Sequence, residues 1–299
     1  MRNTFINTLN GKVDENTMLL IGDLGFSIVE KFAENHPGQL LNCGVAEQNM
    51  TGIAAGFAME GFKVFTYSIA NFNTLRCLEQ IRNDICYHNL DVTVVSVGGG
   101  FVYGSAGYSH HAVQDVAILS SLPHMTMLLP GDPDEMTYCT NYALNNKGPK
   151  LLRVGKNGEK NVPKPAPISN IYKVIDSQAP IAILSTGGML NTGFEVAGKL
   201  KEQNVDVDLL SSPVIEIEQP ELYIDILKDY KTIFIIEEHI RLHGCGSIFK
   251  SFLEYYPPKI YTFGIERNDC HNVGKQGYLL KLAGLDADSL SEKIMRLIG

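Results

Sequence analysis

A single acidic residue, Glu47, stands between two apolar segments and is the first candidate for chemistry. Residues 39–43 are typical of a short buried strand, and residues 50–59 form a helical segment that is apolar on almost every side, so we expect it to be packed inside. A carboxylate in this position must be protonated, paired or hydrogen-bonded to a ligand, because an unpaired buried charge is costly. Catalytic sites collect such groups, although an acid also stabilises the first turn of a helix.

Two adjacent histidines, His110 and His111, follow a glycine-rich segment at residues 98–107. Glycines allow a loop to approach a ligand closely, and an imidazole suits reversible proton transfer to a substrate oxygen near neutral pH. Two histidines on a surface loop would give the same pattern. The residues alone are compatible both with proton transfer at a substrate and with two histidines on a surface loop.

Three more polar residues are candidates for ligand contacts: Asp23, Ser27 and Arg153. Asp23 follows an expected strand at the kind of turn where α/β sheets bind ligands, and the planar guanidinium of Arg153 is suited to phosphate. Asp23 or Ser27 could instead cap a helix, and Arg153 could form a surface ion pair.

Short apolar strands alternate with amphipathic helices along the chain, which predicts two doubly wound α/β domains with mostly parallel sheets. In the first we expect strands at 18–21, 64–67, 92–97 and 125–129, and helices at 27–35, 47–60, 72–87 and 134–145. In the second we expect strands at 181–185, 207–210, 232–236 and 260–263, and helices at 189–202, 221–228, 248–255 and 288–298. A polar, proline-rich stretch separates them, so the expected domains are 1–158 and 179–299, with a linker at 159–178.

Composition excludes several classes of function. A net charge of −8 without a cluster of Lys and Arg argues against nucleic-acid binding, and no apolar run is long enough to span a bilayer. The N-terminal residues lack the apolar core of a signal peptide, and the six cysteines form no Cys-x-x-Cys pair. We therefore expect a cytoplasmic protein with buried, reduced cysteines and no membrane partner.

The order of the segments resembles that of the transketolase family of thiamine diphosphate enzymes over essentially the whole chain. The resemblance is carried by the motif around Glu47 and by the segments that follow it in family order: 61–68, 77–84, 98–111, 130–135 and 148–153. It extends to a second unit similar to the transketolase C-terminal domain. The closest similarity is to the C-terminal subunit of a split transketolase, in which two polypeptides share the enzyme.

The resemblance implies roles for the candidate residues. Glu47 would hydrogen-bond a pyrimidine ring nitrogen of thiamine diphosphate and so activate the cofactor, with Ile69 and Phe72 as apolar walls beside the ring. His110 would relay protons at the substrate's hydroxyl and carbonyl oxygens. The other implied substrate contacts are Asp23, Ser27, His111 and Arg153.

The resemblance also implies a missing half of the site. The family binds the cofactor's diphosphate through Mg²⁺ or Ca²⁺, held by a Gly-Asp-Gly motif in another domain, and no Gly-Asp-Gly occurs in these 299 residues. We therefore expect no metal ligand in this chain. We expect a separate N-terminal diphosphate-binding transketolase subunit as partner, in a heterotetramer of two copies of each chain.

The implied activity is transfer of a two-carbon ketol unit from a ketose to an aldose. Ala106 stands where single-chain transketolases have an acid that recognises a sugar hydroxyl, and Gly98 stands where they have a histidine that helps hold phosphate. These departures allow a sugar with another anionic group as substrate. Two alternatives stay open. One is a deoxyxylulose-phosphate-synthase-like or 2-oxoacid-decarboxylating subunit, and the other is a non-catalytic assembly subunit.

Overall fold

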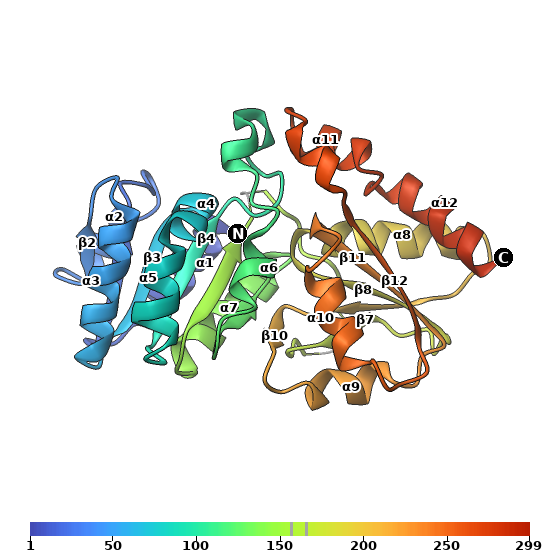
Figure 1. The fold of residues 1–299 in the computed structure, drawn as a ribbon, viewed down its shortest axis with the longest axis horizontal. Helices are drawn as coiled ribbons and strands as arrows, with labels where there is room; N and C mark the ends of the chain where they lie inside the picture. The colour runs from blue at the N-terminus through green and yellow to red at the C-terminus, as the bar shows by residue number, and fades with distance from the viewer. Residues whose placement is uncertain (156–157, 165–166) are drawn as a thin grey trace.

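Two α/β units lie side by side, the N-terminal one shown in blue to green and the C-terminal one in yellow to red (Figure 1). A computed structural model describes residues 1–155, 158–164 and 167–299. Within these residues the units are built on sheets of seven and five strands. The expected two-domain α/β fold is confirmed.

The first sheet has the strand order β10-β5-β6-β4-β3-β1-β2, and all its pairings are parallel except that of β10 with β5. Its strands are β1 (Thr17–Ile21), β2 (Leu40–Asn42), β3 (Lys63–Ile69), β4 (Val92–Val97), β5 (Thr126–Leu128), β6 (Lys150–Val154) and β10 (Val214–Glu216). The chain leaves β1 for β2 on one side and returns to β3 on the other. In open α/β sheets such a reversal places a ligand crevice at the carboxyl ends of the strands.

Helices cover both faces of this sheet. They are α1 (Arg2–Asn10), α2 (Glu30–Asn35), α3 (Glu47–Met59), α4 (Ala70–Asn73), α5 (Leu78–Gln80), α6 (Asp115–Leu119) and α7 (Pro133–Asn145). The helix expected at 72–87 is interrupted: the 3₁₀ turn η1 (Leu75–Cys77) and the π-helical η2 (Ile81–Cys86) flank α5. The break follows Asn73, whose buried amide donates to the carbonyls of Thr66 and Val95 and so ties this point of the helix to the sheet.

Helix α3 corrects one expectation from the sequence. Met50, Ala54 and Ala58 pack into the core, but Gly52 and Gly56 face outward, and a Cβ built on either glycine has no heavy atom within 4 Å. The helix is therefore buried on one side only. Its apolar composition misled the prediction because small residues on the outer face look the same in sequence as small residues in a core.

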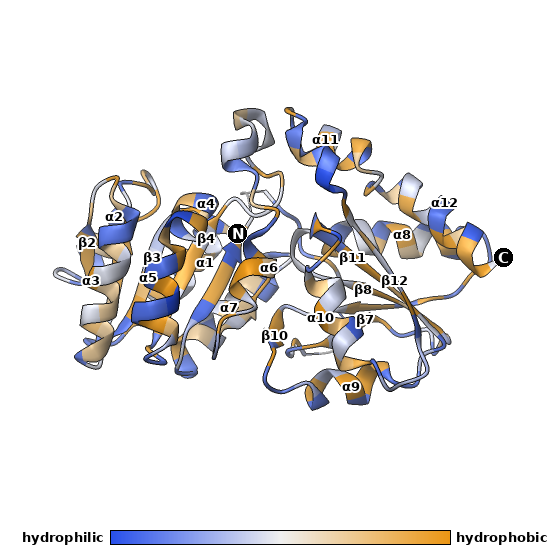
Figure 2. Ribbon diagram, in the orientation of Figure 1, coloured by the Kyte–Doolittle hydropathy of each residue, from blue (hydrophilic) through white to orange (hydrophobic). Residues whose placement is uncertain are grey.

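The second sheet has the order β12-β11-β8-β9-β7, with β7 (Tyr172–Ile175), β8 (Ile181–Ser185), β9 (Asp208–Ser211), β11 (Thr232–Ile240) and β12 (Lys259–Ile265). It is flanked by α8 (Leu190–Glu202), α9 (Glu221–Leu227), α10 (Cys245–Phe252), α11 (Gln276–Leu282) and α12 (Ala287–Ile298), with 3₁₀ turns η5 (Gly187–Met189) and η6 (Arg267–His271). Apolar residues concentrate in its strands and on the inner sides of its helices (Figure 2). None of the described helices is both long and apolar enough to cross a bilayer.

The two units share structure across the expected boundary. Strand β7 lies inside the segment expected to be a linker, and β10 leaves the second unit to pair antiparallel with β5 of the first. Ile215 and Tyr223 thereby join the same apolar cluster as Met127 and Leu129. The crossing strand and this common core bind the units to each other.

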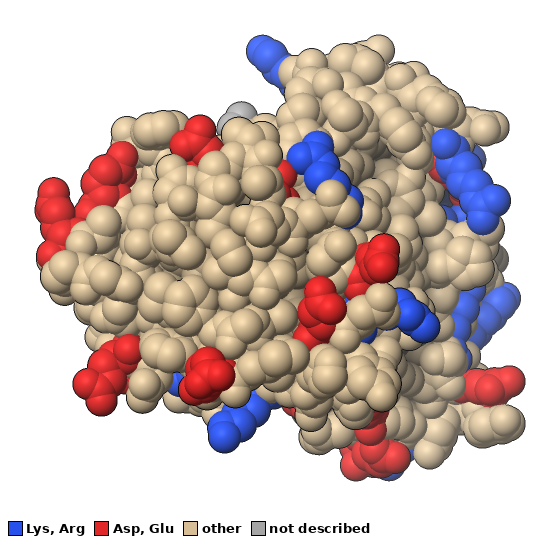
Figure 3. Space-filling view, turned by 60° about the vertical axis from the view of Figure 1, so that its left-hand side comes forward, with Lys and Arg blue, Asp and Glu red and all other residues tan. Residues whose placement is uncertain are grey.

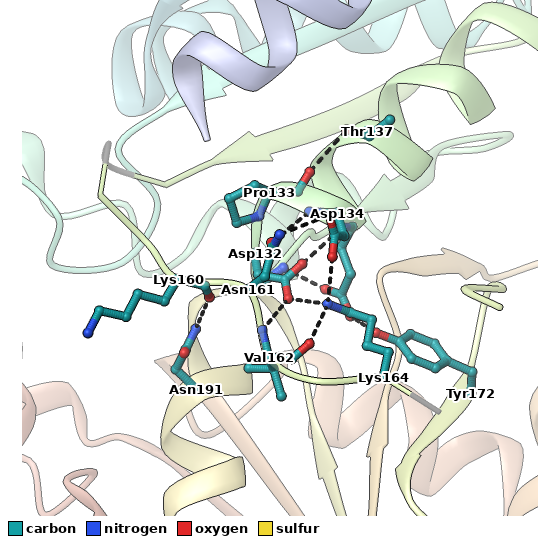
Figure 4. A network of polar contacts seen from close by, with 12 residues as sticks. Asp132, Pro133, Asp134, Thr137, Lys160, Asn161, Val162, Lys164, Tyr172 and Asn191 are labelled. Carbon is teal, nitrogen blue, oxygen red and sulfur yellow. Dashed lines mark hydrogen bonds and ion pairs between the residues drawn. The ribbon is translucent and has the colours of Figure 1, made fainter. Parts of the chain in front are cut away.

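The described part of the linker is held by polar contacts with the start of α7 (Figure 4). Asp132 accepts hydrogen bonds from the backbone of Glu135, as an N-cap, and from the backbone of Val162 at 3.0 Å, and it pairs with Lys164. The side chain of Asn161 donates to Asp134 at 3.0 Å. The part of the expected linker at residues 165–166 lies outside the described residues.

Candidate functional site

Glu47 is the first residue of α3, and its side chain is only 2 % exposed. The hydroxyl of Ser68 donates a hydrogen bond to Oε1 at 2.9 Å, and Nη1 of Arg76 pairs with Oε2 at 2.9 Å. A buried carboxylate needs this combination of a counter-charge and a hydrogen-bond donor. The acid is therefore held by β3 and by the helical segment that follows it.

The close approach of β3 and the start of α3 to the end of β1 depends on Gly22, which directly follows β1. A Cβ on Gly22 would lie 2.9 Å from Oγ of Ser68 and 3.4 Å from Cγ of Glu47. Any side chain there would displace the acid or its hydroxyl partner. The carboxylate thus lies at the carboxyl ends of β1 and β3, where the chain reverses its winding.

Phe72 and Arg76 extend the cluster from Glu47 to His110. The Cζ atom of Arg76 lies 4.3 Å from the centroid of the Phe72 ring, and the ring of His110 lies edge-on to Phe72 at 5.3 Å. Ile69, half-buried, ends β3 just before this segment. Arg76 thus links Glu47 to Phe72, and the ring of Phe72 links this pair to His110. The sequence analysis missed Arg76, although its four-residue spacing from Phe72 places both on one side of a helical segment.

His110 ends the short 3₁₀ turn η4 (Tyr108–His110) and is partly exposed. Its Nδ1 lies 3.0 Å from the hydroxyl of Ser109. The side-chain amide of Asn71, in α4, donates to the carbonyls of Ser109 and His111 at 3.1 and 3.0 Å. The backbone on both sides of His110 is therefore fixed to the element that carries Phe72.

His111 lies in a different environment from its neighbour. It is fully buried, and its Nδ1 and Nε2 lie 3.0 and 3.2 Å from the backbone carbonyls of Cys270 and Gly104. Both ring nitrogens face groups of the chain itself. These contacts do not provide the substrate contact that we expected of His111.

Asp23 and Ser27 lie on the exposed loop after β1, both with positive φ angles, of 51° and 64°. The amide of Asn42 donates to Asp23 at 3.1 Å, and the backbone N–H of Ser27 donates to Glu30 at 2.7 Å. Since Asp23 directly follows Gly22, it stands at the rim of the Glu47 cluster. Ser27 lies farther along the same loop.

Arg153 is placed at the junction of the two units rather than in the Glu47 cluster. Its guanidinium pairs with Asp115 at 3.1 Å and donates to the backbone carbonyls of Glu238, at 3.1 Å, and Ala112. It lines a cavity of about 410 Å³. The lining includes Gly99 of the first unit and Gly188 and Gln276 of the second.

Two family models match this chain. A family model described as the transketolase pyrimidine binding domain matches residues 7–158, and one described as the transketolase C-terminal domain matches residues 172–290. The chain belongs to the transketolase family. As predicted, it carries the pyrimidine-binding and C-terminal domains.

Relatives of this transketolase-family chain include both subunits and whole enzymes. It is 27 % identical to one of the subunits of the apulose-4-phosphate transketolase of Actinobacillus succinogenes, over 90 % of this chain and 88 % of that one. It is 29 % identical to 1-deoxy-D-xylulose-5-phosphate synthase of Clostridium tetani, over 90 % of this chain but only 44 % of that enzyme. A solved structure of a split-gene transketolase, described as an inactive beta4 tetramer, matches with a TM-score of 0.84 at 26 % identity, covering 99 % of this chain and 97 % of that one.

Two further features of this transketolase-family chain escaped the sequence analysis. Within the described residues, Nε of Arg2 and the hydroxyl of Tyr67 are buried without a hydrogen-bond partner. Burial raises the pKa of Tyr67 to about 12, against the opposing charge of Arg2. Polar groups left without partners in this way are candidates for ligand contacts. An arginine near the first residue of a chain gives no such signal in the sequence.

The second missed feature is a group of buried acids at the junction. Burial raises the pKa of Glu237 to about 7 and also raises that of Glu238. Glu237 accepts hydrogen bonds from the first backbone N–H groups of α10, and Glu238 accepts from the backbone of Phe101 at 2.8 Å and from Gln276. Glu238 therefore joins the two units, whereas Glu237 caps a helix within the second. No group of three or more His, Cys, Asp and Glu side chains in the described part of the chain is arranged to hold a metal ion.

Proposed function

We propose that this chain is the pyrimidine-binding subunit of a thiamine-diphosphate-dependent transketolase that transfers a two-carbon ketol unit from an anionic ketose to an aldose. The observation that carries the proposal is the buried carboxylate of Glu47, held beside Phe72 and His110 in a domain that matches the pyrimidine-binding family model.

The residues around Glu47 suit the pyrimidine half of the cofactor. A carboxyl group can hydrogen-bond a ring nitrogen of an aminopyrimidine, and the ring of Phe72 and the side chain of Ile69 offer apolar surface to a flat heterocycle. The cofactor, when bound, supplies the carbon nucleophile that adds to a carbonyl. The protein supplies orientation, a buried acid and exclusion of water.

His110 would move the proton at the substrate oxygens. Its imidazole is partly exposed, close to Phe72, and set in a backbone that Asn71 fixes. These features fit a group that must reach a bound sugar while keeping one orientation. For the anionic end of the sugar we propose Ser27, on the loop after β1, and Arg153, along the junction cavity. Asp23, at the rim of the site, is proposed as a further substrate contact.

We propose that a second polypeptide completes the site. It would hold the diphosphate and its Mg²⁺ or Ca²⁺, and two copies of each chain would form a heterotetramer. Two large apolar residues in the loops after β1 and β2 are exposed, Phe26 at 79 % and Val45, two residues before Glu47, at 75 %, and Leu41 of β2 also lies on the surface. A broad part of this end of the molecule carries few charged side chains (Figure 3). Such a surface is typical of a protein–protein interface.

Reconstitution with a diphosphate-binding transketolase subunit and Mg²⁺ tests the proposal. We expect the pair to transfer a two-carbon unit from a phosphorylated ketose to an aldose, and the isolated chain to bind the cofactor weakly in calorimetry. Tight cofactor binding by the chain alone would refute the shared site. Formation of the pair without any turnover would favour a non-catalytic assembly subunit.

A second candidate is a subunit that decarboxylates pyruvate or another 2-oxoacid, as in deoxyxylulose-phosphate synthesis. It is favoured by the 29 % identity to a 1-deoxy-D-xylulose-5-phosphate synthase, which is as high as the identity to the transketolase subunit. The two candidates share Glu47 and differ in substrate. Carbon dioxide released from pyruvate by the reconstituted pair, without ketol transfer, would identify the second.

A further inference from the structure

The buried ring of His111 connects the loop that carries His110 to the second domain. Nδ1 faces the carbonyl of Cys270, in η6, and Nε2 faces the carbonyl of Gly104, in the turn η3 (Gly104–Ala106) of the same loop. The carbonyl of Gly104 also accepts the backbone N–H of Gly274 at 3.3 Å. The loop and the segment before α11 rise side by side above the sheets (Figure 1).

Further contacts fix the same segment of the loop. The backbones of Gly100 and Ala112 exchange two hydrogen bonds, of 2.8 and 3.0 Å, and the N–H of Ile240, at the end of β11, donates to the carbonyl of Val113 at 2.9 Å. The ring of Phe101 packs edge-on against His111 at 5.0 Å. The second domain therefore holds the residues that follow His110 at two points, one through a side chain and one through the backbone.

The first domain also holds the backbone around His110. The amide of Asn71 donates to the carbonyls of the residues immediately before and after His110. Asn71 itself is adjacent to Phe72, whose ring lies against His110. His110 is thus placed between an anchor on α4 and an anchor on the second domain.

We propose that His111 and Asn71 are positioning residues for His110, and that the second domain acts in catalysis by fixing the orientation of this loop through the carbonyl of Cys270. For the catalytic part, this inference rests on the proposed function. It gives the second domain a role in the site although no residue of that domain needs to touch the substrate. It also replaces the substrate contact expected of His111 by a contact within the chain.

The two contacts of His111 can be separated by substitution, because a neutral imidazole has one N–H and donates to only one of the two carbonyls at a time. The amide nitrogen of Asn occupies nearly the position of Nδ1, and that of Gln nearly the position of Nε2. His111→Asn therefore keeps a donor toward Cys270, whereas His111→Gln keeps one toward Gly104. His111→Phe keeps an aromatic ring and removes both polar contacts, and Asn71→Ala removes the anchor on α4.

A matched control is available in His36, whose Nε2 lies 2.9 Å from the carbonyl of Asn10 and whose ring packs against Phe32. His36→Phe also deletes a bond from an imidazole to a backbone carbonyl, but far from the loop of His110. It reports the effect of such a loss on stability alone.

The experiment combines two readouts. In the reconstituted pair we expect kcat to fall roughly 10- to 100-fold in His111→Phe and Asn71→Ala, because a displaced proton-transfer group slows the chemical step. KM for the sugar and the affinity for the cofactor should change less than about threefold. His111→Asn should retain more activity than His111→Gln, and His36→Phe should match the unmodified chain.

The second readout is NMR of the histidine rings in the ¹⁵N-histidine-labelled full chain. The His110 signals should shift or broaden in His111→Phe and Asn71→Ala, and should be unchanged in His36→Phe. This measurement needs no activity, so it decides the positioning role even if the pair transfers no ketol unit. Should His111→Phe fail to fold, Asn71→Ala and the Asn and Gln variants give the same comparison.

Two results would overturn the inference. One is an unchanged set of His110 signals in every folded variant. The other is a loss of kcat that His111→Asn and His111→Gln share equally and that follows thermal stability, as it would for a residue that only supports the fold.

Discussion

Glu47 and Arg76 form an ion pair in which the acid is buried and the base is nearly half exposed. Oε2 and Nη1 are 2.9 Å apart, and the side chains are 2 % and 44 % exposed, respectively. The same guanidinium lies over the ring of Phe72. One side chain thus connects the acid proposed to contact the cofactor with the ring proposed to pack against it.

Replacing Arg76 by Gln measures how much this ion pair contributes to the stability of the fold. The carboxylate of Glu47 would keep its bond to Ser68 but lose its counter-charge, so we expect a loss of about 1–3 kcal/mol in the free energy of unfolding. The exposed Arg82 on the same helical segment provides the control, and Arg82→Gln should change stability by less than about 0.5 kcal/mol. Chemical denaturation of the full chain measures both. Equal effects would contradict the ion pair.

The ring of Phe72 should matter for the cofactor more than for the fold. Phe72→Leu keeps an apolar side chain and removes the aromatic face, which is worth about 0.5–1.5 kcal/mol in a ring–ring contact. We expect cofactor affinity in the reconstituted pair to fall roughly 2- to 10-fold. Phe252→Leu removes a ring of α10 that stacks on Tyr223 of α9, and it should leave the affinity unchanged. Calorimetric titration of the reconstituted pair with the cofactor measures the affinity of both variants, and an equal loss of affinity in both would contradict the role of the Phe72 ring.

Glu135 should make the stability of the chain depend on pH. It is fully buried at the start of α7, accepts a hydrogen bond from Tyr172 at 2.7 Å, and burial raises its pKa from 4.5 to about 7. Between these values the folded chain keeps a proton that the unfolded chain releases. Stability should therefore fall as pH rises from about 4.5 to about 7, by up to about 3 kcal/mol, and level off above.

The variant Glu135→Gln isolates this effect, because its side chain does not titrate. The difference in unfolding free energy between the unmodified chain and the variant should shift in favour of the variant as pH rises through this range. Glu237 titrates in the same direction, and His239, whose pKa burial lowers to about 4, in the opposite one, but both are common to the two proteins. A difference that stays constant from pH 4.5 to 7 would disprove the assignment.

Substitutions at two glycines with positive φ, Gly61 and Gly100, measure the cost of backbone strain and the cost of a close contact separately. Gly61→Ala meets no atom within 4 Å, so it should cost only the left-handed conformation, about 1–2 kcal/mol. Gly100→Ala has the same constraint and would also place Cβ against the carboxyl group of Glu238, which bonds Phe101 across the domain junction. We expect a loss larger by about 1–3 kcal/mol, measured by thermal denaturation. Similar losses of stability in both variants would show that the side chain of Glu238 moves aside at little cost in free energy.

The sequence was sufficient for the elements that repeat a simple pattern. The buried strands β1, β3, β4 and β8 are mostly apolar, so the fold class was predictable. The strand before Glu47, β2, was expected at the right place but not its exposure: Leu41 and Asn42 are exposed, because β2 lies at the edge of the sheet. The rest depended on contacts between distant segments. Strand β10 has only three residues, and its place in the first sheet is set by pairing with β5.

In the candidate site, too, some features were predictable from the sequence and others depend on contacts between distant segments. His110 and His111 are adjacent and chemically identical in sequence, yet one is partly exposed beside Phe72 and the other is enclosed by two carbonyls. Only the fold separates them, because Cys270 lies 159 residues away. Arg153 was expected at the substrate for its chemistry, while its contacts lie along the domain junction, which a local pattern cannot reveal.

The most direct measurement compares turnover of the reconstituted pair containing the unmodified chain, Glu47→Gln or Glu60→Gln. Glu60 is exposed at the other end of α3 and serves as the control. We expect Glu47→Gln to retain its fold and lose activity by about 100-fold or more, because an amide cannot share a proton with the cofactor's ring as a carboxyl group can, while Glu60→Gln turns over normally. Normal turnover by Glu47→Gln would contradict the proposed role of the acid and the function built on it.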